Sequence, residues 1–137
     1  MIPTLSIRNP IAVSLGAIAG ALCRYYLNLW LPQIFGTGFP YATLLVNLTG
    51  SFTIGVISTL AIQQVGFITP EIILLLVVGF LGSYTTFSSY ELDSLNLWRG
   101  SGWQIAFFYW FGSAVGGFFS LYLGILLAKF FINAHHS

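Results

Sequence analysis

The sequence predicts an all-α integral membrane protein with four transmembrane helices, the third of them broken, in a single membrane domain covering residues 1–137. Hydrophobic residues make up 57% of the chain and charged residues 5%, whereas a soluble domain carries about 25% charged residues. So few charges cannot cover a soluble fold, and the bilayer of a cell (inner or plasma) membrane is the expected environment. A net charge of +1 provides no basic surface, so no nucleic-acid partner is expected.

The first expected helix covers about residues 10–31, and about 20 apolar residues suffice to cross a bilayer. Gly16 and Gly20 form a GxxxG pattern, which favours close packing against another helix. Arg24 lies near the far end of this segment and has two interpretations. It is either a headgroup anchor whose long side chain reaches the membrane surface, or a positive charge in the vestibule of an anion pathway.

The second expected helix covers about residues 41–63 and carries a stripe of polar and small residues. The stripe repeats every fourth position, which places its members on one helical face: Thr43, Asn47, Ser51, Gly55 and Thr59. An amide in the middle of a membrane is costly unless it is used. Asn47 is either a hydrogen-bonding link between helices or part of a pore lining, and we favour the pore.

The third expected helix covers about residues 71–97 and is broken near residues 82–86. Its apolar beginning is interrupted by Gly79 and Gly82, after which hydroxyl and aromatic residues follow as far as Tyr90. Backbone that leaves a helix inside hydrocarbon must be satisfied by protein, by water or by an ion. Discontinuous helices at this depth are where membrane proteins bind ions, so the break predicts an ion site.

The fourth expected helix covers about residues 103–132, longer than the bilayer core requires, so it should tilt or project. It carries a polar and small row at a spacing of four: Tyr109, Ser113 and Gly117. Four crossings would place both termini on one side of the membrane.

The basic residues are divided evenly between the two expected sides of the membrane. Arg8 and Lys129 fall on the side of the termini, and Arg24 and Arg99 fall on the opposite side. Because orientation follows the bias in Lys and Arg, this tie gives no preferred orientation. The chain could therefore insert both ways and form an antiparallel homodimer about a two-fold axis in the membrane plane.

Three segments resemble the Fluc (CrcB-type) fluoride channels. Residues 82–90 resemble the signature GGxTTFSTF, residues 16–25 the pattern GxxxGAxxRY, and residues 43–52 the pattern TLxVNxxGSF. The segments occur in the family's order and spacing. The resemblance implies a dual-topology antiparallel homodimer that acts as a passive, fluoride-selective channel, lowers cytoplasmic fluoride by exporting it, and is not an enzyme.

Fluoride is a small, strongly hydrated hydrogen-bond acceptor, so a selective pore must offer donors in place of water. Suitable donors are the amide of Asn47 and the hydroxyls of Thr43, Ser88 and Ser113. Aromatic rings can also face an anion with their positive edges. The resemblance implies that Phe87 and Tyr90 flank the pore, that Asn47 lines it, and that Tyr109 and Ser113 form a polar track on the fourth helix.

The resemblance also implies a structural Na⁺ on the dimer axis, held by the backbone carbonyls of Gly82 and Thr85. Two positions depart from the family pattern. Tyr90 stands where phenylalanine is usual, which should add a hydroxyl to the pore wall. Gly117 stands where relatives can carry serine, which should shorten the polar track.

Two other classes of protein fit the composition less well. A small proton-coupled multidrug exporter needs a carboxylate inside the membrane, usually in its first helix, and residues 10–31 contain none. A purely structural membrane subunit would explain the glycine patterns. It would leave Asn47 and the hydroxyl-rich break without a purpose.

Overall fold

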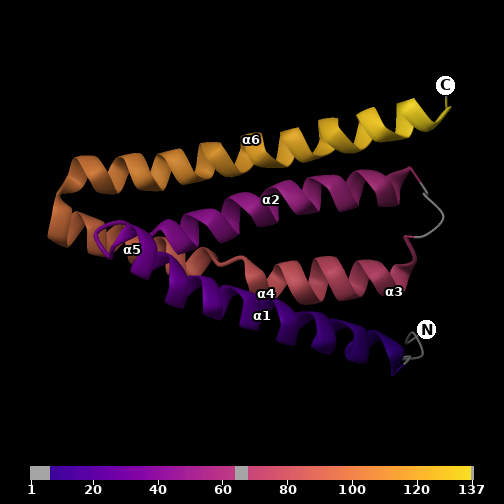
Figure 1. Ribbon diagram of the computed structural model, residues 1–137, viewed down its shortest axis with the longest axis horizontal. Coiled ribbons are helices and arrows are strands. Elements are labelled where there is room, and N and C mark those ends of the chain that lie inside the picture. The colour runs from indigo at the N-terminus through magenta and orange to yellow at the C-terminus, as the bar shows by residue number, and fades with distance from the viewer. Residues whose placement is uncertain (1–6, 64–67, 137) are drawn as a thin grey trace, which may run out of the picture.

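The computed structural model describes residues 7–63 and 68–136, and every regular element among them is helical. The elements in chain order are α1 (Arg8–Phe35), α2 (Tyr41–Ile62), α3 (Pro70–Ile73), η1 (Leu74–Leu81), α4 (Gly82–Tyr84), α5 (Phe87–Ser101) and α6 (Trp103–His136). In Figure 1, α2 lies between α6 and the α3–α4 segment, and α1 lies below that segment. The start of α1 and the end of α6 lie at one end of the bundle, and the α5–α6 turn lies at the other.

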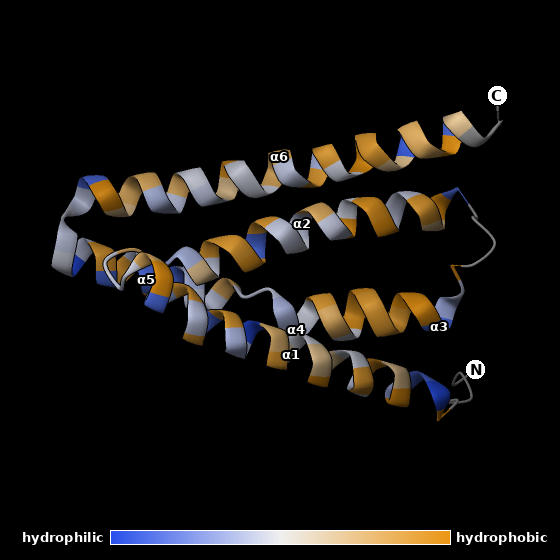
Figure 2. Cartoon of the chain, in the orientation of Figure 1, coloured by the Kyte–Doolittle hydropathy of each residue, from blue (hydrophilic) through white to orange (hydrophobic). Residues whose placement is uncertain are grey.

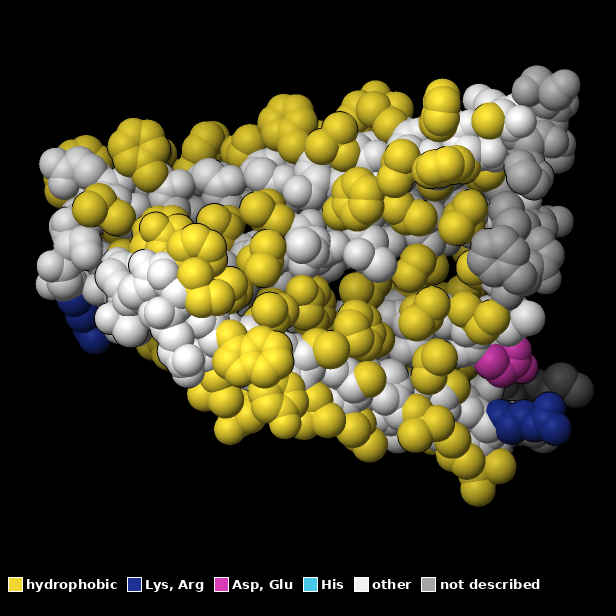
Figure 3. Space-filling view, in the orientation of Figure 1, with side chains coloured by type: hydrophobic (Ala, Val, Ile, Leu, Met, Phe, Trp, Pro, Cys, Tyr) yellow, Lys and Arg dark blue, Asp and Glu magenta, His cyan; other side chains and the backbone are white. Residues whose placement is uncertain are grey.

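Four helical segments are long and apolar enough to cross a membrane. They are Arg8–Phe35, Tyr41–Ile62, Pro70–Ser101 and Trp103–Ala134. Figure 2 shows that apolar residues run along all of them, and Figure 3 shows charged side chains only near the two ends of the visible face. The expectation of an all-helical membrane protein with four spanning segments is therefore confirmed.

Glycines bring α1 into direct contact with η1. Gly16 and Gly20 are buried, and a Cβ at these positions would overlap the carbonyl oxygens of Leu75 and Phe80 respectively. On the η1 side of the same contact, a Cβ at Gly79 would lie 2.5 Å from the Val13 carbonyl oxygen of α1. The GxxxG pattern thus mediates close helix packing, as expected, and its partner is the first part of the third spanning segment.

Close packing at glycines also joins α2 to α6. A Cβ at Gly55 would overlap the carbonyl oxygen of Leu121, and a Cβ at Gly124 would overlap that of Phe52. Each glycine therefore admits the backbone of the opposite helix. Lipid tails are as apolar as leucine, so helices in a bilayer associate mainly through such close packing and through hydrogen bonds.

The beginning of the third segment is not a regular α-helix. Residues Leu74–Leu81 form a π-helix, and the Gly82 N–H donates to the carbonyl of Val77, five residues earlier. The wider π turn is usually a short insertion found near functional sites. Its apolar sequence fits either kind of helix, so the sequence predicted only a helix here.

The chain leaves helical geometry at Thr85 and Thr86, whose backbone is extended, with φ/ψ of −78°/159° and −153°/118°. Before this point, the N–H and hydroxyl of Thr85 both donate to the Leu81 carbonyl, at 3.0 and 2.9 Å. After it, the Thr86 hydroxyl caps α5 by accepting the Ser89 N–H at 3.2 Å. Hydroxyls thus satisfy backbone groups on both sides of the two extended residues.

Replacing Gly20 with valine should disrupt the α1–η1 contact, because the new Cβ meets backbone that cannot move aside as a side chain can. We expect a loss of at least about 1–3 kcal/mol of stability, typical of overpacking. The thermal unfolding midpoint in detergent measures it. Gly112→Val is the matched control, since a Cβ at Gly112 meets nothing within 4 Å. Equal midpoints for the two variants would contradict the packing argument.

Candidate functional site

Asn47 of α2 binds the extended backbone between α4 and α5 at two points. Its Nδ2 donates to the Thr86 carbonyl at 3.0 Å, and its Oδ1 accepts the Thr86 N–H at 2.8 Å. These bonds satisfy a peptide unit that has left the helix and would otherwise need water or an ion. The linking role of Asn47 is therefore present, while one Nδ2 hydrogen stays available for a ligand.

Two open grooves meet at Asn47. We call the first the break groove; it has a volume of about 380 Å³ and is lined by residues that include Asn47, Ser51, Gly82, Thr85, Phe87 and Tyr90. We call the second the α6 groove; it measures about 390 Å³ and is lined by residues that include Asn47, Ser51, Phe87, Tyr90, Ser113 and Gly117. The grooves share four residues, so together they form one continuous polar and aromatic surface. Most of the expected pore residues lie on this surface.

Phe87 and Tyr90 differ in their surroundings although their ring centroids lie 5.8 Å apart. The Phe87 side chain is 74% exposed, whereas Tyr90 is 7% exposed and packs between α5 and α6. The Tyr90 hydroxyl donates to the Trp110 carbonyl at 2.6 Å. The extra hydroxyl expected on the pore wall is therefore used to join two helices.

Tyr109 and Ser113 are four residues apart on α6 and so share a face of that helix. Tyr109 is 2% exposed, and its ring meets Phe39 edge-on at a centroid distance of 5.4 Å. The Tyr109 Oη and Ser113 Oγ atoms are buried, and among the described residues no hydrogen-bond partner lies within 3.5 Å in suitable geometry; the side chain nearest to bonding Tyr109 Oη is Thr43. Buried polar groups normally have a partner, so these two hydroxyls call for a water molecule or an ion.

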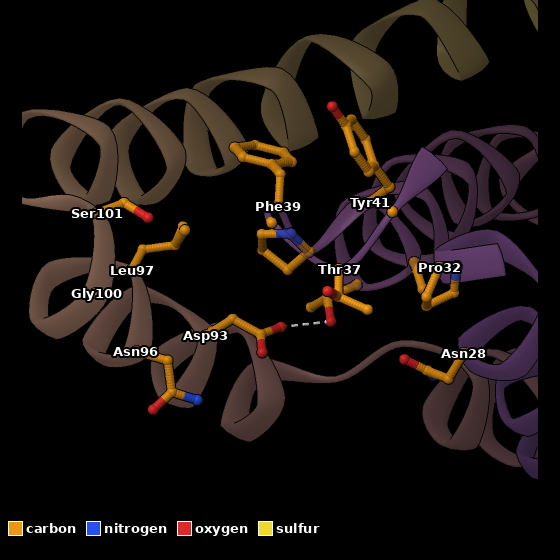
Figure 4. Close-up of a pocket in the computed structure, with 15 residues that line it drawn as sticks. Asn28, Pro32, Thr37, Phe39, Tyr41, Asp93, Asn96, Leu97, Gly100 and Ser101 are labelled. Carbon is orange, nitrogen blue, oxygen red and sulfur yellow. Dashed lines mark hydrogen bonds between the residues drawn. The ribbon is translucent and has the colours of Figure 1, made fainter. Parts of the chain in front are cut away.

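A third groove, which we call the end groove, has a volume of about 460 Å³ and lies where α1, α2 and α5 approach one another. Figure 4 shows Asp93 pointing across it from α5, with Asn28 of α1 on the far side. The Thr43 hydroxyl donates to Asp93 Oδ2 at 2.6 Å, so Thr43 is already committed to a carboxylate.

Sequence reasoning assigned no role to the two carboxylates of α5. These carboxylates are Glu91 and Asp93. Both lie inside the third spanning segment, where Asp93 binds Thr43 and Glu91 accepts the Trp110 indole N–H at 3.3 Å. The available signal was the presence of two acidic side chains shortly after the break in the third expected helix.

The side chain of Arg24 extends to the break. Its Nη1 lies 3.5 Å from the Thr85 carbonyl oxygen, at the long limit of a hydrogen bond. The guanidinium places a positive charge beside the break groove and not among the residues that line the end groove. Neither expected role, headgroup anchor or vestibule charge, includes this contact.

Gly82 and Thr85, whose backbone carbonyls are the expected Na⁺ ligands, both line the break groove. Among the described residues no three His, Cys, Asp or Glu side chains converge. The Thr85 carbonyl has a second lone pair beyond the one directed at Arg24. A cation would, however, feel repulsion from that guanidinium.

Three expected pore residues do not line this surface: Thr43, which lines the end groove, Tyr109, which is buried beside it, and Ser88. Ser88 is exposed, it does not line the break groove or the α6 groove, and its Oγ lies 3.5 Å from Thr86 Oγ1. Its position in the first turn of α5 nevertheless places its backbone amide at the helix N-terminus. Amides in that turn lack intrahelical acceptors and carry a partial positive charge.

The fold and grooves define a class of protein: a small multi-pass membrane protein with a polar track between its helices. Residues 11–125 match the family model described as CrcB-like protein, Camphor Resistance (CrcB), and the chain belongs to this family. This confirms the resemblance drawn from the three motifs.

Similar proteins from several bacteria carry one name. The chain is 53% identical over 129 residues to a protein of Trichormus variabilis named fluoride-specific ion channel FluC, covering 94% of both chains. It is 52% identical over 124 residues to a protein of that name from a Synechococcus strain, covering 90% of this chain and 95% of the relative. A third, from Synechocystis, is 46% identical over 124 residues with the same coverage.

Replacing Asn47 with alanine should destabilise the protein, because it leaves the N–H and C=O of Thr86 without partners. Each unsatisfied buried group costs about 1–3 kcal/mol, so the thermal midpoint in detergent should fall clearly. Ser51→Ala is the matched control, since Ser51 lines the same grooves one turn away. A midpoint no lower for Asn47→Ala than for Ser51→Ala would show that the two bonds contribute nothing.

Proposed function

We propose that this protein is a passive, fluoride-selective channel of the cell (inner or plasma) membrane that exports fluoride and lowers its cytoplasmic concentration. Membership of the CrcB-like family and the name shared by its relatives support fluoride as the ion. The observation that carries the proposal is the pair of buried hydroxyls without partners, Tyr109 and Ser113. The inside-negative membrane potential would drive the anion outward, so no coupled energy source or catalytic step is required.

The groups along the shared surface suit an anion that must lose its water. On this surface Asn47 keeps one amide hydrogen free and Ser113 has an uncommitted hydroxyl, and Tyr109 adds a buried hydroxyl one turn away on α6. The N-terminus of α5 adds amides that favour negative charge. Phe87 can turn its positive ring edge toward the ion. Several weak sites in succession allow an ion both to enter and to leave.

A second copy of the chain would complete this path. Phe87 is 74% exposed in the single protomer, and both grooves at Asn47 are open along one side. We infer an antiparallel homodimer, in which a two-fold axis in the membrane plane brings the two breaks together. Arg24 contacts Thr85, so we leave it out of the count of basic residues that flank the spanning segments. Two then remain on the side of the termini, Arg8 and Lys129, and one on the opposite side, Arg99. This small difference is compatible with insertion in both orientations.

A structural Na⁺ on the dimer axis is the remaining part of the proposal. The carbonyls of Gly82 and Thr85 from both copies would surround it, four in all, with one Arg24 guanidinium beside each Thr85 carbonyl. The ion would hold the two breaks together; the path for fluoride runs beside it, along Asn47 and Ser113.

The direct test is fluoride efflux from liposomes that contain the purified protein, followed with a fluoride electrode after addition of a potassium ionophore. We expect rapid fluoride loss and little chloride loss from matched vesicles. Equal release of both ions, or no release of fluoride, would refute the function.

Tyr109→Phe separates transport from stability. It removes a buried hydroxyl that has no partner, so the thermal midpoint should stay the same or rise. A hydrogen bond to a charged group contributes about 1.5–3 kcal/mol, so fluoride efflux should fall by about tenfold or more. Tyr90→Phe is the control: it loses the bond to Trp110 and about 1 kcal/mol of stability, with efflux near wild type. The reverse pattern would place the ion path away from Tyr109.

The sodium proposal predicts that replacing Na⁺ with N-methyl-D-glucamine lowers the thermal midpoint of the detergent-solubilised protein and shifts it toward monomer. The bulky cation cannot fit among backbone carbonyls, and a partner that binds only the native state stabilises it by mass action. Size-exclusion chromatography with light scattering gives the oligomeric state. If both quantities are the same in the two salts, the ion is not structural.

A further inference from the structure

A separate cleft of about 440 Å³ lies between α5 and α6. Its lining from α5 is Glu91, Ser94, Leu95 and Trp98, and its lining from α6 is Trp103, Ala106, Phe107 and Trp110. The α5 positions are offset by two residues from those that line the end groove, Asp93, Asn96, Leu97 and Gly100. Two residues correspond to about 200° around a helix, so the cleft and the end groove lie on opposite faces of α5.

The cleft concentrates indole rings around one carboxylate. It contains three of the chain's four tryptophans, and Trp98 and Trp103 are each 63% exposed. Glu91 is exposed in the cleft and accepts only the long bond from the Trp110 indole, at 3.3 Å. Within residues 7–63 and 68–136 no Lys, Arg or His forms an ion pair with it. Its negative charge is therefore available to a cation that enters the cleft.

These features select the charge of the occupant. Cations are attracted to the faces of aromatic rings, most strongly to tryptophan, and the carboxylate adds a full opposite charge. The remaining lining, Leu95, Ala106 and Phe107, is apolar and suits a hydrocarbon tail. The occupant is therefore an organic cation with an apolar part that enters from the bilayer.

Ser94 indicates which kind of cation. Its hydroxyl donates to the Tyr90 carbonyl at 2.8 Å, so its proton is used and its lone pairs remain as acceptors. Together with the free Glu91 oxygen this gives two acceptors beside the rings. A primary ammonium has three N–H donors for them, whereas a quaternary ammonium has none. We propose that the cleft between α5 and α6 is a binding site for amphiphilic primary ammonium ions, with Glu91 as the charge partner and the tryptophans as the walls.

Intrinsic fluorescence of the intact protein in a non-ionic detergent tests the site, in a Trp30→Phe background that removes the tryptophan outside the cleft. The probes are n-dodecylammonium, dodecyltrimethylammonium and dodecanol, which share a tail and differ in the head. We expect dodecylammonium to bind tightest and dodecanol weakest. Equal affinity for dodecanol and dodecylammonium would overturn the proposal, because the cleft would then recognise only the tail.

Glu91→Gln should weaken dodecylammonium binding by about tenfold to a hundredfold and leave dodecanol unchanged, as expected for loss of one charge-assisted bond. Glu71→Gln is the matched control, because Glu71 lies in the same spanning segment but outside the cleft. Unchanged binding by Glu91→Gln would overturn the proposal.

A second variant keeps the proposal testable if Glu91→Gln fails to fold. Ser94→Ala keeps the carboxylate and removes one acceptor, so it should reduce the preference for dodecylammonium over dodecyltrimethylammonium. An unaltered preference would contradict the role of Ser94 and with it the selection of a primary ammonium. Neither readout depends on fluoride transport.

The same titration in vesicles distinguishes two sources of the ammonium group. If phosphatidylethanolamine occupies the site, dodecylammonium will bind more weakly in vesicles of that lipid than in phosphatidylcholine vesicles. Equal affinity in the two lipids identifies free amphiphilic amines as the ligands.

Discussion

The rest of the structure depends on the two hydrogen bonds between Asn47 and the Thr86 peptide unit. Without them, two polar backbone groups would face hydrocarbon, and the third segment would be more stable as an uninterrupted helix. With them, the chain can remain extended at Thr85 and Thr86, and α5 can begin again at the edge of the grooves, which Phe87 lines. The Asn47 side-chain amide of α2 therefore allows two features inside the membrane. One is a non-helical stretch of backbone, and the other is a helix N-terminus that attracts anions.

This hydrogen bonding works only because the helices are held at a fixed, short separation. Gly16, Gly20 and Gly79 bring α1 against η1, and Gly55 and Gly124 bring α2 against α6. A protein in lipid gains little from burying apolar side chains, so contacts between backbones must position the helices. A further contact, between Gly50 and the Thr85 side chain, sets α2 directly against the break, one turn beyond Asn47.

The features that follow a repeat in the sequence could be predicted, and those that depend on a side-chain direction could not. The spanning segments, the glycine packing and the site of the two extended residues each leave a periodic or compositional mark. The π-helix at Leu74–Leu81 leaves none, because its apolar residues suit either winding. The direction of Arg24 toward Thr85, and of the Tyr90 hydroxyl toward Trp110, depends on which neighbour lies within reach. The bond from Thr43 to Asp93 joins residues 50 positions apart, which no local pattern records.

Trp110 connects the proposed ion path to the outer surface of the protein. Its carbonyl accepts the Tyr90 hydroxyl at 2.6 Å, while its indole donates to Glu91 at 3.3 Å. Tyr90 and Glu91 are consecutive residues on α5, so a single residue of α6 contacts both the inward and the outward face of that helix turn. The hydrogen bond to the Trp110 carbonyl comes from the Tyr90 hydroxyl, which a phenylalanine at this position would lack. The hydroxyl that distinguishes this chain from the family pattern therefore fixes α5 to α6 at the level of the pore ring, and leaves the donors of Tyr109 and Ser113 free for the anion.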